Sequence, residues 1–155
     1  MDKLYIISLP KSKKIAAKTA LYAGWIGFWV LLIYSFIMEV IIKDRLFMIF
    51  FTVLMLLAGT FFNIALHEIF KEKRNKITEL TETQVAKGYS RGVTASLCCI
   101  ISAAATLLFE AIIPYFYPYY QATLAAYLVW VGVLLCTVIQ LIGSSVINKS
   151  IKPVE

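Results

Sequence analysis

Charged residues in this chain are confined to short segments, and the segments between them are long and uncharged. Thr19–Met38, Leu46–Leu66 and Gly92–Phe109 contain no Asp, Glu, Lys or Arg, and a fourth such segment runs from Ala111 to Asn148. An α-helix needs about 20 mostly apolar residues to cross the hydrocarbon core of a bilayer. Each of the first three segments is therefore predicted to form one membrane-spanning helix.

The fourth uncharged segment is too long for a single spanning helix. It contains the sequence IPYFYPYY at residues 113–120, in which Pro114 and Pro118 lie among four tyrosines. Proline removes a backbone donor and disfavours helical geometry in the residue before it, and tyrosine is enriched at membrane–water interfaces. The sequence therefore predicts an all-α integral membrane protein with four transmembrane helices, near residues 19–40, 46–70, 92–113 and 122–147.

The composition agrees with this fold class and excludes several kinds of protein. Of the 155 residues, 61% are hydrophobic and 15% are charged, whereas soluble domains are typically about 45–50% apolar and about 25% charged. So short a chain cannot bury that much apolar surface in water. A soluble enzyme, a nucleic-acid-binding protein and a disulfide-stapled secreted domain are therefore excluded, and the lipid bilayer is the expected surrounding.

Lysine and arginine predict the orientation in the membrane, because these residues are retained in short cytoplasmic segments. The N-terminal segment, the polar connection at residues 71–91 and the C-terminal tail together hold 13 of the 15 basic residues, and only Lys43 and Arg45 lie elsewhere. Both termini are therefore predicted to be cytoplasmic. The expected location is the cytoplasmic (inner) membrane of a bacterium.

The connections between the helices predict how they pair. The loop around Lys43–Arg45 is short, so the first two helices are expected to form one antiparallel hairpin, and the last two a second hairpin across the tyrosine-rich turn. Residues 1–155 then make one four-helix transmembrane domain, with residues 71–91 as a cytoplasmic connection. The short apolar segment Leu4–Leu9 is expected to lie along the membrane surface.

Residue patterns give little support for catalysis. His67 and Glu68 begin an H-E-x-x-H pattern that fails because residue 71 is lysine, and a single histidine cannot build a multi-histidine zinc site. The three cysteines include no C-x-x-C pair. The sequence therefore predicts no catalytic centre, no metal and no cofactor.

Polar residues inside the predicted spans are functional candidates, because burying them in lipid is costly. Asn63 and Glu110 lie a short way inside the membrane, His67 lies at its edge, and only Gln140 approaches the middle. No ionisable residue is expected at the midplane, which disfavours a proton-coupled transporter.

Small and polar residues also form stripes along the predicted helices. In the fourth helix, Gly132, Cys136, Gln140 and Ser144 recur every four residues. Small residues let membrane helices approach closely, and polar ones form hydrogen bonds between them. Three arrangements of these stripes are therefore open. They face one another inside one bundle, they form a face for association with another protein, or they line a pore.

Three functional hypotheses follow. The first is a small polytopic membrane subunit, without its own catalytic centre, that self-associates or docks a membrane protein through its small and polar helix faces. The alternative is an oligomeric channel or facilitator lined by the stripe around Gln140. The third is a lipid-directed membrane enzyme that uses Asn63, His67 and Glu68.

Overall fold

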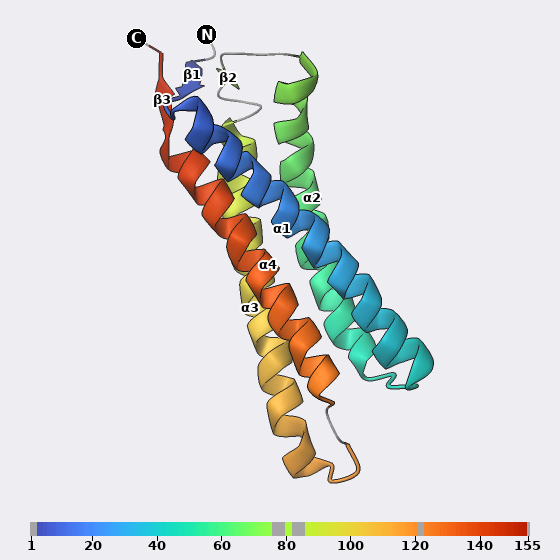
Figure 1. Ribbon diagram of the computed structural model, residues 1–155. Coiled ribbons are helices and arrows are strands. Elements are labelled where there is room, and N and C mark those ends of the chain that lie inside the picture. The colour runs from blue at the N-terminus through green and yellow to red at the C-terminus, as the bar shows by residue number, and fades with distance from the viewer. Residues whose placement is uncertain (1–2, 76–79, 82–85, 121–122, 155) are drawn as a thin grey trace.

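The computed structural model is a bundle of long helices (Figure 1), and it describes residues 3–75, 80–81, 86–120 and 123–154. In these residues, four helices are long and apolar enough to cross a membrane, which confirms the predicted multi-pass helical architecture. The first of them consists of α1 and a wider π-helical end, η1. Their bounds are Lys11–Ser35 for α1, Phe36–Ile42 for η1, Met48–Asn75 for α2, Lys87–Phe116 for α3 and Leu124–Lys149 for α4.

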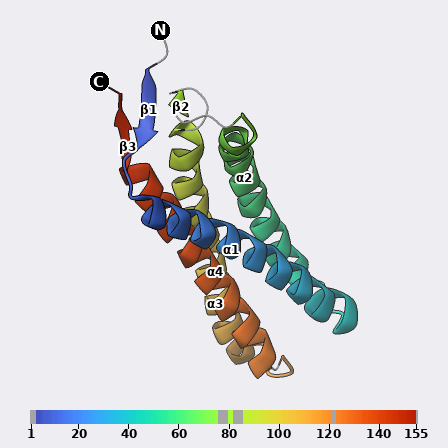
Figure 2. The same cartoon turned by 45° about the horizontal axis from the view of Figure 1, so that its top comes forward.

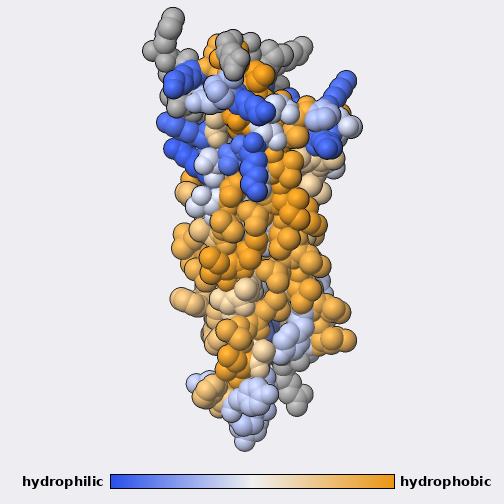
Figure 3. All heavy atoms as spheres, turned by 90° about the vertical axis from the view of Figure 1, so that its left-hand side faces the viewer, coloured by the Kyte–Doolittle hydropathy of each residue, from blue (hydrophilic) through white to orange (hydrophobic). Residues whose placement is uncertain are grey.

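The outward faces of the helices carry large apolar side chains. Ile26 of α1, Leu57 of α2, Ile101 of α3 and Leu135 of α4 are all exposed on the surface of the bundle. Figure 3 shows an apolar band on one face of the molecule, between a strongly hydrophilic end and a paler end. A surface of this kind is stable in contact with lipid and not with water.

The two ends of the bundle are built differently. Both chain termini lie at one end, which we call the terminal end, and the loops between η1 and α2 and between α3 and α4 lie at the other, the loop end (Figure 1). At the loop end, Asp44 reverses the chain with a positive φ of 51°, a conformation that aspartate tolerates better than most residues.

The terminal end carries a small antiparallel sheet that the sequence analysis did not predict (Figure 2). Strand β1 (Leu4–Ile7) pairs on one side with β2 (Leu80–Thr81) and on the other with β3 (Ile151–Pro153). Tyr5 and Ile7 of β1 pack against the buried cluster below the sheet, and the alternate residues are exposed. The segment expected to lie along the membrane surface is thus a strand that ties the N-terminal tail to the C-terminal tail.

The helices of the structure extend beyond several of the predicted span boundaries. Helix α2 continues to Asn75 and α3 begins at Lys87, so much of the predicted polar connection at residues 71–91 is helical, and residues 76–79 and 82–85 of it lie outside the described part. Helix α3 runs through Pro114 to Phe116. It therefore ends three residues beyond the boundary predicted near residue 113, for a reason given below.

The predicted pairing into two hairpins is not confirmed. Helix α1 packs most extensively against α4, while α3 packs against both α2 and α4. The contact between α1 and α2 is made by large side chains that bridge a wider gap, such as the ring of Phe28 over Gly59 and the stacked rings of Tyr22 and Phe70. The first two helices are therefore neighbours in sequence, but the closest backbone approach of α1 is to α4.

Candidate functional site

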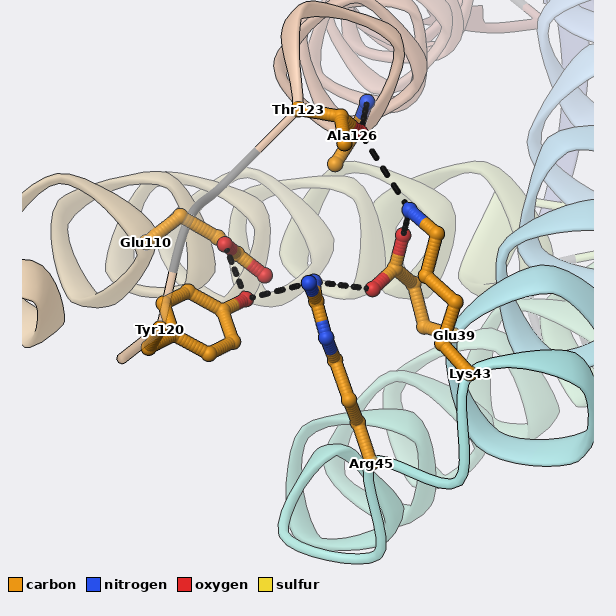
Figure 4. A network of polar contacts seen from close by, with 7 residues as sticks. All are labelled: Glu39, Lys43, Arg45, Glu110, Tyr120, Thr123 and Ala126. Carbon is orange, nitrogen blue, oxygen red and sulfur yellow. Dashed lines mark hydrogen bonds and ion pairs between the residues drawn. The ribbon is translucent and has the colours of Figure 1, made fainter. Parts of the chain in front are cut away.

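An ionic network joins the two loops at the loop end (Figure 4). The carboxylate of Glu39, in η1, accepts hydrogen bonds from Lys43 at 3.0 Å and from Arg45 at 2.7 Å. Glu39 is only 4% exposed, so its two cationic partners offset the cost of removing the carboxylate from water. Lys43 also donates to the hydroxyl of Thr123, which caps the start of α4. We call this set of residues, together with Glu110 and Tyr120, the loop-end network.

Tyr120 connects this network to α3. Its hydroxyl donates to the Glu110 carboxylate at 2.6 Å and accepts a hydrogen bond from Arg45 at 3.3 Å, and the Arg45 guanidinium lies 4.4 Å from the centre of its ring. Burial, followed by the hydrogen bond to Glu110, raises the pKa of Tyr120 above its ordinary value of 10.0. Tyr120 therefore remains a protonated donor at neutral pH.

A hydrogen bond to the backbone carbonyl of Glu110 explains why α3 tolerates Pro114. In a helix the N–H of residue 114 would donate to the carbonyl of Glu110, and Pro114 has no N–H. The Tyr127 hydroxyl of α4 donates to that carbonyl instead, at 3.0 Å. Because a neighbouring helix supplies the missing donor, the helix continues past the proline.

A third buried carboxylate, that of Glu72, organises the terminal end. Glu72 of α2 is 6% exposed, accepts a hydrogen bond from the Tyr89 hydroxyl of α3 at 3.1 Å and forms an ion pair with Lys18 of α1 at 3.3 Å. Lys14 approaches the same carboxylate to 4.0 Å. Three helices are thus held together by one side chain, which the sequence analysis had counted only as part of a charged connection.

The stripe on α4 faces the other helices of the same chain. A Cβ atom added to Gly24 of α1 would lie 2.6 Å from the carbonyl oxygen of Cys136, and one added to Gly27 would lie 2.6 Å from its sulfur. A Cβ atom added to Gly132 would lie 2.9 Å from the side chain of Leu31 in α1. One added to Gly92 of α3 would lie 3.4 Å from the Ser144 hydroxyl. Within this single chain, the stripe therefore packs against α1 and α3.

Several buried polar atoms of α3 and α4 have no hydrogen-bond partner within the part of the chain that the structure describes. Gln140 is fully buried and neither its amide oxygen nor its amide nitrogen has a partner; the same holds for the Ser144 hydroxyl, the Trp130 indole N–H and one carboxylate oxygen of Glu110. Unpaired polar groups in a membrane interior are costly and are therefore of functional interest. Gln140 is the most central of them.

The residues proposed for a lipid-directed active site, all in α2, have different surroundings. The Asn63 side-chain oxygen accepts hydrogen bonds from the indoles of Trp25 at 2.6 Å and Trp29 at 3.3 Å. His67 is exposed on the outside of α2, and Glu68 forms an ion pair with Lys71 at 3.1 Å. Asn63 thus joins α1 to α2.

The tyrosine-rich turn forms an exposed aromatic surface at the loop end. Tyr119 is fully exposed, Tyr115 is 86% exposed and Phe116 is 74% exposed. A hollow of about 380 Å³ lies beside them, lined by Phe47, Ile113, Tyr117, Tyr119 and Tyr120. We call the residues 115–117, 119 and 120 the aromatic surface.

Glu110 and Gln140 are marked in the sequence as polar residues within apolar segments, whereas the residues that surround Glu110 are not marked. Tyr120, Tyr127 and Arg45 are ordinary interfacial residue types, so nothing in their spacing marks them. The one available signal was Pro114 itself, because a proline inside an apolar segment implies an orphan carbonyl four residues earlier. Among the described residues, no group of three His, Cys, Asp or Glu side chains is close enough to hold a metal ion.

Comparison of the chain with protein-family models, with curated proteins and with solved structures finds no match.

Proposed function

We propose that this chain is a small polytopic membrane subunit that acts by association, with a second copy or with another membrane protein, through the aromatic surface at its loop end. The observation that carries the proposal is the exposed hollow of about 380 Å³ lined mainly by tyrosines. Tyrosine is enriched in protein interfaces because it offers a large, rigid contact area together with a hydrogen-bonding hydroxyl.

The loop-end network supports this proposal by holding the surface in one shape. Tyr120 lines the hollow and is fixed from behind by Glu110 and Arg45. A surface that is ordered before binding loses less conformational entropy when a partner docks. The small and polar stripe of α4 is a poorer candidate for the contact with a partner, because Gln140 and Ser144 are buried within one copy.

The orientation belongs to the same proposal. With 13 of the 15 basic residues in the N-terminal segment, the connection at residues 71–91 and the C-terminal tail, the positive-inside rule predicts that both termini are in the cytoplasm and the aromatic surface is on the other side of the membrane. We propose the cytoplasmic membrane of a bacterium as the location. The partner then contacts the protein from the extracytoplasmic side.

Site-specific photo-crosslinking in native membranes tests the proposal. We expect benzoyl-phenylalanine at residue 119 to give a discrete protein adduct, and the same group at Leu57, which is 66% exposed on α2, to give none. An adduct at twice the mass of 17.5 kDa identifies a second copy, and any other mass a different protein. The adduct is expected to disappear in the Tyr117→Ser background, because that change removes one wall of the hollow.

The alternative explanation of the aromatic surface is an anchor in the membrane interface. In that case residue 119 reacts only with lipid, as Leu57 does, and the association proposal is abandoned.

A facilitator is the second candidate, and the unpartnered Gln140 amide favours it. Because Gln140 is buried within one copy, a water path along it runs through the bundle and not between copies. Protein reconstituted in liposomes is expected to conduct a small polar solute or ions, and Gln140→Leu to abolish this flux, while the outward-facing change Ile139→Leu leaves it intact. Flux that is absent or insensitive to Gln140→Leu removes this candidate.

The lipid-directed enzyme receives the least support of the three hypotheses, since Asn63 is engaged by two tryptophans and Glu68 by Lys71. Replacing His67 with alanine tests it directly. A cellular phenotype that is unchanged by His67→Ala excludes this residue as an acid–base group.

A further inference from the structure

A groove runs along the outside of the bundle between α1 and α4, close to the terminal end. Its volume is about 280 Å³, and it is lined by Lys13, Ala16 and Ala20 of α1 and by Ile142, Gly143 and Val146 of α4. It differs from the rest of the lipid-facing surface, where large apolar side chains project outward.

The shape of the groove follows from the close approach of the two helices beneath it. A Cβ atom on Gly143 would lie 2.6 Å from the carbonyl oxygen of Ala17, so the two backbones are nearly in contact there. Ala16 and Ala20 carry only methyl groups, so the wall that α1 contributes to the groove is low. Ile142 and Val146, which are exposed, form the opposite wall. The result is a mostly apolar groove on the lipid-facing surface, with a low floor where the two backbones meet.

Positive charge without an acidic partner lies at the mouth of this groove. Lys13 lines it, and Lys149 lies on the same face of α4 as Ile142 and Val146, seven and three residues further along. For neither lysine is an ion pair found among the residues that the structure describes, whereas Lys14 and Lys18, on the other side of α1, approach Glu72.

The start of α1 adds to this positive character. The helix begins at Lys11 with no side-chain cap and no acidic residue in its first turn. Its first N–H groups and the positive end of its dipole are therefore available to a negative group at the membrane surface.

We propose that this groove binds one anionic phospholipid. The acyl chain lies along Ala16 and Ala20, and the headgroup phosphate is held between Lys13 and Lys149 at the terminal end. Basic residues at the mouth of an apolar cleft between transmembrane helices are the arrangement that recognises acidic lipid headgroups. A zwitterionic lipid fits the groove equally well but gains less from the two lysines.

Native mass spectrometry of the detergent-solubilised protein, titrated with phosphatidylglycerol or phosphatidylcholine of the same chain length, tests the proposal. We expect one phosphatidylglycerol to bind in preference to phosphatidylcholine. The double change Lys13→Gln and Lys149→Gln is expected to weaken phosphatidylglycerol binding about tenfold or more and to leave phosphatidylcholine binding unchanged.

Two further variants separate the groove from general electrostatic attraction. The matched control Lys87→Gln and Arg91→Gln removes two exposed charges at the same end of the bundle, from α3, and is expected to leave phosphatidylglycerol binding unchanged. Ala16→Phe keeps both lysines and obstructs the groove, so it is expected to weaken binding without changing the unfolding midpoint.

Three results overturn the proposal. Equal losses in the groove variant and in the α3 control mean that the lipid is attracted only by overall charge. Equal binding of the two lipids means that the groove holds ordinary boundary lipid. If Ala16→Phe changes the mass of the assembly and not the lipid occupancy, the groove is covered by another helix.

Discussion

The absence of a side chain at Gly24 and Gly143 determines how closely α1 approaches α4. At both positions an added Cβ atom would lie 2.6 Å from a backbone oxygen of the other helix. Backbone cannot move aside as a flexible side chain can, so these residues set the distance between the helices. At the same scale, Tyr127 completes the hydrogen bonding of α3 by supplying one donor to the carbonyl of Glu110.

Replacing Gly24 with alanine is expected to destabilise the protein by about 1–3 kcal/mol, because the methyl group overlaps the carbonyl of Cys136. Gly92→Ala is the matched control, since its Cβ would make an ordinary contact with the Ser144 hydroxyl at 3.4 Å. Alanine is also the better helix former, so this control is expected to be neutral or slightly stabilising. Detergent-induced unfolding measures both, and equal effects would contradict the assigned close approach.

The pairing of Pro114 with Tyr127 predicts a coupling between the two residues. Tyr127→Phe removes the donor to the Glu110 carbonyl and is expected to cost about 0.6–2 kcal/mol of unfolding free energy. In a Pro114→Ala background, the restored N–H of residue 114 takes over this carbonyl, so the cost of Tyr127→Phe is expected to shrink. A double-mutant cycle measures the coupling, and additive effects would show that Tyr127 does not compensate for the proline.

At the scale of whole elements, buried carboxylates join helices and loops at each end of the bundle. Glu39 holds the loop before α2 through Lys43 and Arg45, while Glu72 joins α2 to α1 and α3 through Lys18 and Tyr89. Truncating one partner of such a group leaves a buried charge uncompensated, which is strongly destabilising. The charged segments that the sequence analysis interpreted as topological signals therefore also have a structural role.

Tyr120 makes the loop-end network sensitive to high pH. Its pKa is raised in the folded protein, so the stability that it contributes is fully present below its ordinary pKa of 10.0 and is lost as the pH rises toward the folded value. We expect the wild-type protein to lose more unfolding free energy above pH 10 than Tyr120→Phe does. The difference between the two curves isolates this residue from the other tyrosines, and parallel curves would show that its hydroxyl is not held in the network.

At the scale of the whole molecule, the apolar band has a hydrophilic end with both termini and a paler end with the aromatic surface (Figure 3). The sequence alone predicted four spans, because the cost of placing charge in lipid is a local property of each segment. The proposed orientation follows from where the basic residues lie. Orientation is defined only for the protein in its membrane, and it can be tested there directly.

Cysteine labelling in intact cells tests this orientation. In a background without the three native cysteines, Tyr119→Cys is expected to react with a membrane-impermeant maleimide, whereas Ser8→Cys of the terminal end reacts only after the membrane is permeabilised. Both side chains are exposed in the structure, so accessibility to water does not distinguish them. Labelling with the opposite pattern would reverse the proposed topology.

The candidate site could be predicted only where a feature is visible within one segment of the sequence, and not where it depends on contacts between distant segments. Glu110 and Gln140 are marked in the sequence, because a polar residue within an apolar segment is visible by itself. Their surroundings are not marked: Arg45 reaches Tyr120 across 75 residues, and Trp25 reaches Asn63 across 38. The sheet was missed for the same reason, since β1 and β3 come from opposite ends of the chain.

The sequence by itself determined that this is a helical membrane protein with four spans, because the free energy of transferring a segment from water to lipid depends on the residues of that segment. Only the tertiary structure decided which helices touch. The backbone of α1 approaches that of α4 more closely than that of its neighbour α2, since glycine allows close backbone contact at residues 24 and 143 while aromatic rings fill the wider gap between α1 and α2. Such choices depend on shape complementarity between distant segments, which no local pattern records.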